Sequence, residues 1–197
     1  YDSGLYPALA LCLRRRGKVI LDRAIGHARG NGPGDAADVR KVRARHDGLY
    51  CMFSASKMVT AMLVHLLDER HQVHLDDPVA HYVPEFGKKG KHRITLRHVL
   101  THRAGIPRIP AEFADPNLLG RPSEILGLLC EQAPVWRPGR RLGYHALTGG
   151  YVLGAVIERV TGKDVQTFLH DEISAPLGLA HFQFGVAPNR LRDVAEN

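Results

Sequence analysis

The stretch Phe53-Ser54-Ala55-Ser56-Lys57 is the most informative part of the sequence, because it opens a segment of helical periodicity. Apolar residues recur at steps of three and four from here to about Arg70, which predicts a helix that is buried on most of its surface. Ser54 and Lys57 share one face of that helix, so their hydroxyl and ammonium groups can meet. The helix start also favours negative charge near the serine.

This Ser-x-x-Lys spacing is compatible with catalysis, but it is short. A serine hydroxyl is a weak nucleophile until a neighbour removes its proton, and a lysine can take or relay that proton. Two of the four positions are free, however, and a serine at a helix start often serves only as a cap. Ser56 is a weaker candidate nucleophile, because the residue three positions after it is Val59 rather than a lysine.

A second group of interest is Tyr144-His145-Ala146, which follows the turn residues Pro138-Gly139 and leads into a glycine-containing helix start. A phenol normally titrates near pH ~10 and needs a neighbouring cation to act as a base at neutral pH. Lys57 could supply that positive field if the fold brings the two residues together.

The other regions predict a small β element followed by helices. Residues 6–13 and 18–25 are two apolar runs joined by a short turn that ends in glycine, which predicts an antiparallel hairpin. The glycine-rich stretch 26–48 has no steady periodicity and predicts a surface loop. Later helices are predicted to start at Thr95, Pro122 and Asp164. The one that starts at Thr95 is expected to end at Ala104-Gly105 and Pro107, and the one over residues 151–160 at Gly162.

Composition excludes several classes of protein. The 197 residues are 44% hydrophobic and 24% charged, which is enough to build a core and argues against intrinsic disorder. No run approaches eighteen apolar residues, so a membrane span is not expected. The net charge is +7, with basic clusters at 14–16 and 88–93. Aromatic residues do not interleave these clusters, so we expect solvated surface and no nucleic-acid partner.

Cysteine and histidine spacings argue against disulfides and metal sites. Cys12, Cys51 and Cys130 are odd in number and far apart, so reduced and mostly buried thiols are expected, and with them a cytoplasmic location. His98 and His102 are four positions apart on a predicted helix, but no third ligand has a supporting spacing. We expect helix-surface and C-terminal capping positions for both histidines, and neither a metal nor another cofactor.

Several motifs in this order resemble the serine β-lactamase-like family. They are Phe53–Lys57, the stretch 94–102 with Gly105, the stretch 144–150, and 160–162. Within that family they are most similar to the branch of class C β-lactamases and family VIII carboxylesterases, which is related to the penicillin-binding proteins. The resemblance implies an α+β fold of the β-lactamase/transpeptidase type, with an antiparallel sheet flanked by helices and a helical region.

The resemblance also implies a division of the chain. Residues 1–197 correspond to the N-terminal portion of one β-lactamase-like domain, with the sheet hairpin and loop in 1–53 and the nucleophile helix and helical region in 54–197. The family's third motif, a Lys/His-Thr-Gly or similar strand, has no counterpart before Asn197. The remaining sheet strands and the second oxyanion donor are therefore expected beyond this residue.

By the same resemblance, Ser54 is the acylated nucleophile, Lys57 its proton partner, and Tyr144 the phenol that completes the base and passes a proton to the leaving group. His145 and Ala146 are expected to contact the substrate. Ala146 stands where β-lactamases and penicillin-binding proteins commonly have Asn or Ser, which favours an esterase.

The sequence thus predicts a serine hydrolase that forms an acyl-enzyme on Ser54 and cleaves a small-molecule carboxylic ester. Three alternatives stay open: a β-lactamase, a D-amino-acid peptidase or carboxypeptidase that cleaves an amide, and a non-catalytic penicillin-binding-like sensor. The spacing does not decide between Lys57 and Tyr144 as the base, and the oligomeric state is open.

Overall fold

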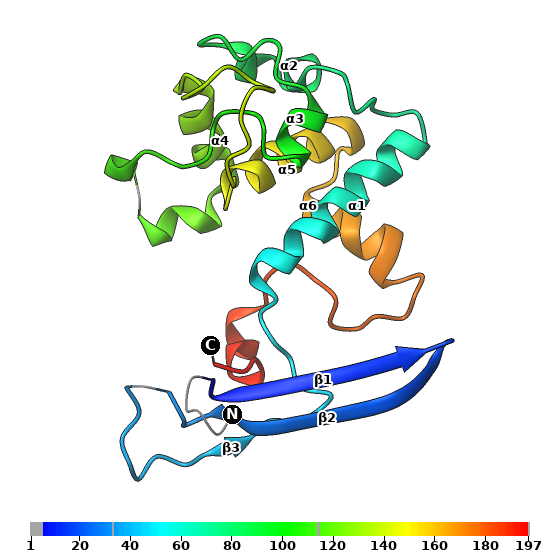
Figure 1. Cartoon of the computed structure of the whole chain (residues 1–197), viewed down its shortest axis with the longest axis vertical. Coiled ribbons are helices and arrows are strands. Elements are labelled where there is room, and N and C mark those ends of the chain that lie inside the picture. The colour runs from blue at the N-terminus through cyan, green and yellow to red at the C-terminus, as the bar shows by residue number, and fades with distance from the viewer. Residues whose placement is uncertain (1–5, 33, 114, 197) are drawn as a thin grey trace. The chain divides into compact units, whose positions relative to one another are not determined.

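The computed structural model describes residues 6–32, 34–113 and 115–196 (Figure 1). The chain divides into two compact units. The sheet unit combines Tyr1–Phe53 with Gly185–Asn197, and the helical unit is Ser54–Phe184.

The sheet unit contains β1 (Ala8–Arg15), β2 (Lys18–Arg29) and β3 (Val42–Arg43), paired antiparallel in that order. The predicted hairpin is confirmed, and Gly17 has the positive φ of 78° that its tight turn requires. The loop prediction for 26–48 is wrong at 26–29 and at 42–43, because β2 runs on to Arg29 and pairs there with β3.

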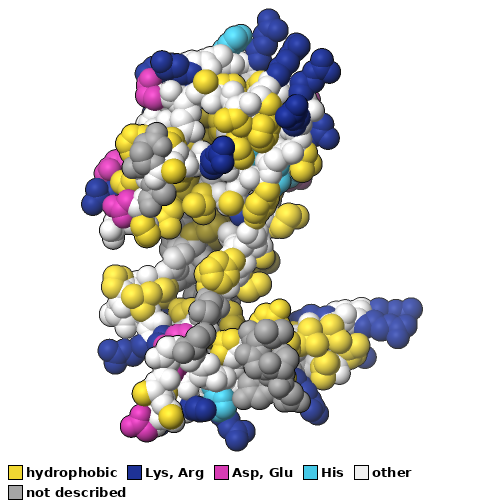
Figure 2. Space-filling view, turned by 60° about the vertical axis from the view of Figure 1, so that its left-hand side comes forward, with side chains coloured by type: hydrophobic (Ala, Val, Ile, Leu, Met, Phe, Trp, Pro, Cys, Tyr) yellow, Lys and Arg dark blue, Asp and Glu magenta, His cyan; other side chains and the backbone are white. Residues whose placement is uncertain are grey.

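One face of the hairpin is apolar and open to solvent. Leu9 lies opposite Ile25, and Leu11 and Leu13 follow on the same face of β1. Each of these four side chains is between 42% and 47% exposed. Figure 2 shows hydrophobic side chains along the projecting hairpin and Lys and Arg side chains at its tip. The β1 strand therefore presents leucines that no described residue buries.

The end of the chain returns to the start of this unit. A 3-10 turn at Pro188–Asp193 brings Arg29 within hydrogen-bond distance of the carbonyl groups of Leu191, at 2.7 Å, and Val194, at 2.8 Å. The main chain of Ala195 donates to the carbonyl of Leu49 at 2.8 Å. Arg29 is thus the side chain that fastens the last turn to β2.

The helical unit contains most of the regular structure (Figure 1). Its helices are α1 (Ser56–Glu69), α2 (Val79–Tyr82), α3 (Leu96–Leu100), α4 (Pro122–Glu131), α5 (Thr148–Thr161) and α6 (Val165–Leu169), which continues as a π-helical turn at His170–Ser174. Short 3-10 turns lie at Phe53–Ala55, Pro84–Gly87, Ala111–Phe113 and Pro116–Gly120.

Most predicted helix boundaries agree with these elements, but α3 ends at Leu100 and not at the predicted Ala104-Gly105. Thr95 caps α3 through a hydrogen bond from the His98 N–H, and Asp164 caps α6 in the same way through Thr167. Gly162 ends α5 in the left-handed conformation. The expected burial of the first helix is wrong in extent: α1 buries Leu63, Val64 and Leu67, but Met58 is 73% exposed.

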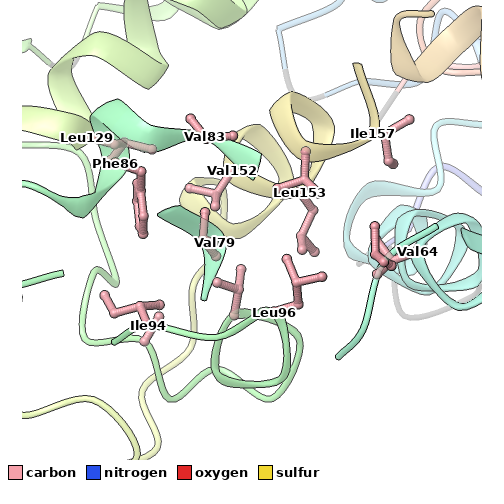
Figure 3. Packing of buried hydrophobic residues seen from close by; sticks show 14 of the residues in the cluster. Val64, Val79, Val83, Phe86, Ile94, Leu96, Leu129, Val152, Leu153 and Ile157 are labelled. Atoms are coloured by element: carbon pink, nitrogen blue, oxygen red, sulfur yellow. The ribbon is translucent and has the colours of Figure 1, made fainter. Parts of the chain in front are cut away.

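The core of this unit forms around α5, which packs against α1, α2, α3, α4 and α6. Figure 3 shows Val152, Leu153 and Ile157 of α5 among the buried side chains of the other elements. Each is at most 5% exposed, and burying such a side chain contributes about 1.5–3 kcal/mol. This packing fixes α5, and with it the residues that lead into the helix.

Lys91 is a charged member of the core. Its side chain is fully buried, and its ammonium group donates to the main-chain carbonyls of Cys130, at 2.8 Å, and of Gln132. These carbonyls lie at the end of α4, where a helix leaves acceptors without partners and favours a positive charge. Burial lowers the pKa of Lys91.

Of the cysteines, Cys130 is buried but Cys12 and Cys51 are exposed, so the expectation of mostly buried thiols is wrong. All three are free thiols. Among the described residues, none of the helices has the length and apolar character needed to cross a membrane.

Candidate active site

Ser54 and Lys57 meet at the start of α1, as their spacing predicts. Ser54 lies in the 3-10 turn that precedes the helix, and the Lys57 ammonium group donates to its Oγ at 3.2 Å. The residue before the serine, Phe53, has a φ of 41°. A bulky residue seldom adopts this left-handed conformation, and such strain is concentrated at functional sites.

Tyr144 reaches the same serine from a distant part of the sequence. Its phenol oxygen is 2.5 Å from Ser54 Oγ, and the Lys57 ammonium nitrogen is 5.0 Å from the centre of its ring. Hydrogen bonds with Lys57 and Ser54, together with the charge of Lys57, lower the pKa of the Tyr144 phenol. The arrangement therefore lowers the pH at which the phenolate forms beside the serine hydroxyl.

A close approach of two segments holds the main chain next to Tyr144. A β-carbon at Gly143 would lie 2.4 Å from the Trp136 ring, so only glycine fits there. The N–H of Gly139 donates to the carbonyl of Arg103 at 2.9 Å. These contacts set the course of the chain before the tyrosine.

His145 is fully buried rather than open to a ligand. Its Nε2 accepts the N–H of Ile106 at 3.1 Å, and its Nδ1 lies 2.5 Å from the carbonyl oxygen of Gly143. Burial is the main reason that its pKa is lowered. Because both ring nitrogens have main-chain partners, this geometry does not support the expected substrate contact of His145 and gives the residue a structural position instead.

Ala146 is exposed and borders a cavity that also reaches Lys57. The cavity has a volume of about 420 Å³. Its walls include Thr60, Leu126, Tyr151 and Phe184, so they are mainly apolar. A longer side chain with a polar end at position 146 would add a polar group to the cavity that Lys57 also lines, whereas alanine adds none.

The structure corrects the placement of two histidines. His98 does not cap the C-terminus of α3: its Nδ1 accepts the N–H of Thr95 at 3.2 Å, at the N-terminus. The helix ends at Leu100, so His102 lies beyond it rather than on its surface. The His102 ring lies edge-on to that of Tyr144 with 5.0 Å between centroids. Sequence reasoning missed this contact, because the helical spacing of 98 and 102 pointed to a shared face.

Within the ranges that the structure describes, no group of three His, Cys, Asp or Glu side chains could hold a metal ion. The site brings together a hydroxyl, an ammonium and a phenol, and these group types are compatible with proton transfer at a serine.

The chain belongs to the Beta-lactamase family, whose sequence model matches residues 2–196. Among curated proteins, it is 34% identical over 155 residues to the Mycobacterium tuberculosis protein named Esterase/beta-lactamase LipL. The aligned residues cover 75% of this chain and 35% of that protein.

Solved structures agree with this family and its fold. A novel penicillin-binding protein homolog from Caulobacter crescentus is 31% identical with a TM-score of 0.83, over 96% of this chain and 48% of that one. A family VIII carboxylesterase is 29% identical with a TM-score of 0.84, over 99% of this chain and 51% of the other. The expected α+β fold of the β-lactamase/transpeptidase type is confirmed. The chain spans between a third and about half of the length of these relatives.

Proposed function

We propose that this chain supplies the nucleophile and proton-transfer groups of a serine hydrolase, and that the bond cleaved is a carboxylic ester. The observation that carries the proposal is the double contact of Ser54 Oγ, with Lys57 Nζ at 3.2 Å and Tyr144 Oη at 2.5 Å. A capping serine needs neither partner, whereas a nucleophilic serine needs a group that takes its proton.

In the proposed reaction, the phenolate of Tyr144 or the Lys57 amine takes the Ser54 hydroxyl proton while Oγ attacks the ester carbonyl carbon. The backbone N–H of Ser54 donates to the oxygen that becomes negative. Collapse of the tetrahedral intermediate breaks the bond to the alcohol oxygen, which receives the same proton. Water then attacks the acyl-Ser54 ester by the reverse proton path and releases the acid.

Labelling of Ser54 tests this proposal. The protein, expressed at its full natural length, is treated with a fluorophosphonate, and we expect one covalent adduct on Ser54. Ser54→Ala should abolish the adduct, and the control Ser56→Ala should keep it. A wild-type protein that takes no label, or a label that persists in Ser54→Ala, would contradict the proposal.

The choice of an ester rests on Ala146 and on the LipL and family VIII carboxylesterase relatives. Hydrolysis of p-nitrophenyl butyrate is expected to be faster than hydrolysis of the β-lactam nitrocefin. Faster nitrocefin hydrolysis would favour the β-lactamase alternative, and covalent labelling by penicillin without turnover of either compound would favour the sensor.

We propose that the apolar cavity beside Lys57 receives the acyl chain. Gly150 and Gly154 of α5 line it, and a β-carbon at either would meet no atom within 4 Å. Gly154→Leu should therefore fill the cavity and lower the turnover of p-nitrophenyl octanoate relative to acetate by at least about tenfold, since each buried CH₂ contributes about 0.8 kcal/mol.

Gly127→Leu on α4 is the matched control for this experiment. A β-carbon at Gly127 also meets open space, and the residue lies outside the cavity. The chain-length preference should stay that of the wild type in this control. An unchanged ratio of octanoate to acetate turnover in a folded Gly154→Leu variant would show that the cavity does not receive the acyl chain.

A further inference from the structure

The phenol of Tyr144 is held in place without the help of regular secondary structure. The described residues 140–147 belong to no helix or strand, yet the phenol oxygen stays 2.5 Å from Ser54 Oγ. An irregular segment keeps such a position only if its main-chain groups have fixed partners elsewhere.

The main-chain N–H groups on both sides of Tyr144 donate hydrogen bonds to one residue, His102. The N–H of Gly143 donates to the His102 carbonyl at 2.9 Å, and the N–H of His145 donates to the His102 Nδ1 at 3.2 Å. The carbonyl and the side chain of His102 thus bracket the tyrosine.

The ring of His102 adds packing to these hydrogen bonds. Its centroid is 5.0 Å from that of Tyr144 in an edge-on arrangement and 5.7 Å from that of His145, on which it stacks. His145 is itself anchored, since its Nε2 accepts the N–H of Ile106 at 3.1 Å. The ring therefore fills the space between the phenol and a rigid, buried neighbour.

The backbone of His102 is in a conformation that the surroundings have to impose. Its φ is 58°, where a β-carbon is unfavourable. Its own N–H donates to Val99 at the end of α3, at 3.1 Å. The strained turn thus places His102 between α3 and the segment 140–147. Such strain persists where the contacts of the surrounding residues fix the conformation.

The ring also has the charge state that this contact requires. Nδ1 accepts an N–H group, so it carries no proton. Burial, and then the positive charge of Lys57, lower the pKa of His102. Tyr144 and His145 are the other titratable groups that its ring contacts. The His102 ring is therefore a neutral acceptor, and it adds no second positive charge beside Lys57.

We infer that His102 is a positioning residue, which holds the Tyr144 phenol on the Ser54 hydroxyl by accepting the N–H groups on both sides of the tyrosine. The inference rests on the proposed function, because the position of the phenol matters if Tyr144 exchanges a proton with Ser54. His102 acts through Tyr144 and needs no contact with the substrate.

Two variants separate the acceptor from the backbone. In His102→Asn, Oδ1 is the same number of bonds from the α-carbon as Nδ1 of histidine, so the acceptor is kept. His102→Gly has no side-chain acceptor. Asparagine and glycine both tolerate the left-handed backbone, so neither variant adds strain at this position.

The measurement is kcat and KM against pH for p-nitrophenyl butyrate, with the rate of fluorophosphonate labelling of Ser54 as a second readout. We expect H102G to lose at least about tenfold in kcat with KM within about twofold. The acid limb of its profile should move to higher pH, because the phenol leaves Lys57 and Ser54. H102N should stay within about threefold of the wild type with an unmoved limb.

A double variant checks that the effect passes through the tyrosine. In a Tyr144→Phe background, H102G should cost less than about twofold more. A further tenfold loss there would overturn the inference, as would a wild-type profile in H102G or a tenfold loss in H102N with an unmoved limb. Thermal unfolding checks that each variant is folded, and the kinetics of H102G and H102N are compared at a temperature at which both are folded. Absence of labelling in the wild type would instead count against the proposed function.

Discussion

Ser54 Oγ is the atom at which three parts of the helical unit meet: the start of α1, the first turn of that helix and the segment before α5. Lys57 arrives through local geometry, while Tyr144 arrives from 90 residues away. The serine is exposed.

Tyr144→Phe should lower kcat/KM by about 10²–10⁴-fold, the usual contribution of a positioned acid or base. Contacts with Lys57 and Ser54 lower the pKa of the phenol, so its reactive phenolate is present above that pKa and is lost as pH falls through it. The wild-type profile should therefore have an acid limb below the titration range of free tyrosine, and the variant should lack this limb.

Tyr82→Phe is the control for this experiment. Burial, together with a hydrogen bond to Asp77, raises the pKa of Tyr82 to about 12, so this phenol does not titrate in the assay range. Its variant should keep the acid limb of the wild type. An acid limb that survives in Tyr144→Phe would assign the titration to another group.

At the level of single residues, the sequence predicts what is local. The contact of Ser54 with Lys57 follows from helical spacing, and the caps at Thr95 and Asp164 follow from their side chains. The approach of Tyr144 depends on tertiary packing and was predictable through the resemblance of its motif to a known family. The left-handed backbone conformation of His102 could not be predicted, because hydrophobic periodicity carries no information about it.

Among the elements, α4 depends on a buried cation at its end. Lys91→Met keeps the length of the side chain but removes the donor to the carbonyls of Cys130 and Gln132. Leaving such acceptors unpaired costs about 1–3 kcal/mol, and we expect a loss of that size in the free energy of unfolding, measured with urea. Lys89→Met, at an exposed neighbour, should change it by less than about 0.5 kcal/mol. Equal effects in the two variants would refute the role of Lys91.

Two glycines of α5 should respond in opposite directions to the same substitution. Gly154 lies inside the helix with open space at its β-carbon position, so Gly154→Ala should stabilise the protein by about 0.5–1 kcal/mol through helix propensity. Gly162 has a φ of 71° at the C-cap, and Gly162→Ala should destabilise by about 1–2 kcal/mol. Calorimetric unfolding measures both, and a stabilised Gly162→Ala would contradict the capping argument.

Element boundaries were predictable at Gly162 and Pro122, which a glycine and a proline mark. Gly105 was a misleading marker, because α3 already ends at Leu100. They were not predictable for β3, a strand of two residues that exists because β2 offers it a partner. The exposure of Met58 on α1 was equally hidden, because periodicity shows which face is apolar and not how much of it is covered.

At the scale of the 197-residue chain, the exposed leucine face of the hairpin favours self-association. An apolar strand at an open sheet edge promotes pairing between copies. Leu11 lies opposite Arg23 across the strands, so Leu11→Glu replaces an exposed apolar side chain with a cross-strand ion pair. In sedimentation velocity experiments on the 197-residue chain, this variant should self-associate less than the wild type. If association is unchanged, the copies contact one another through a surface other than the leucine face of the hairpin.

The sheet unit is built from both ends of the sequence, whereas the helical unit is one continuous segment. During synthesis on the ribosome, the strands emerge before residues 54–184, but the main-chain donors Ala195 and Glu196, which bond to the carbonyls of Leu49 and Ala28, emerge after them. Residues 54–184 can therefore pack around α5 before the strands have their main-chain partners from Ala195 and Glu196. The order of translation assembles Ser54, Lys57 and Tyr144 before the unit that precedes them in the sequence is closed.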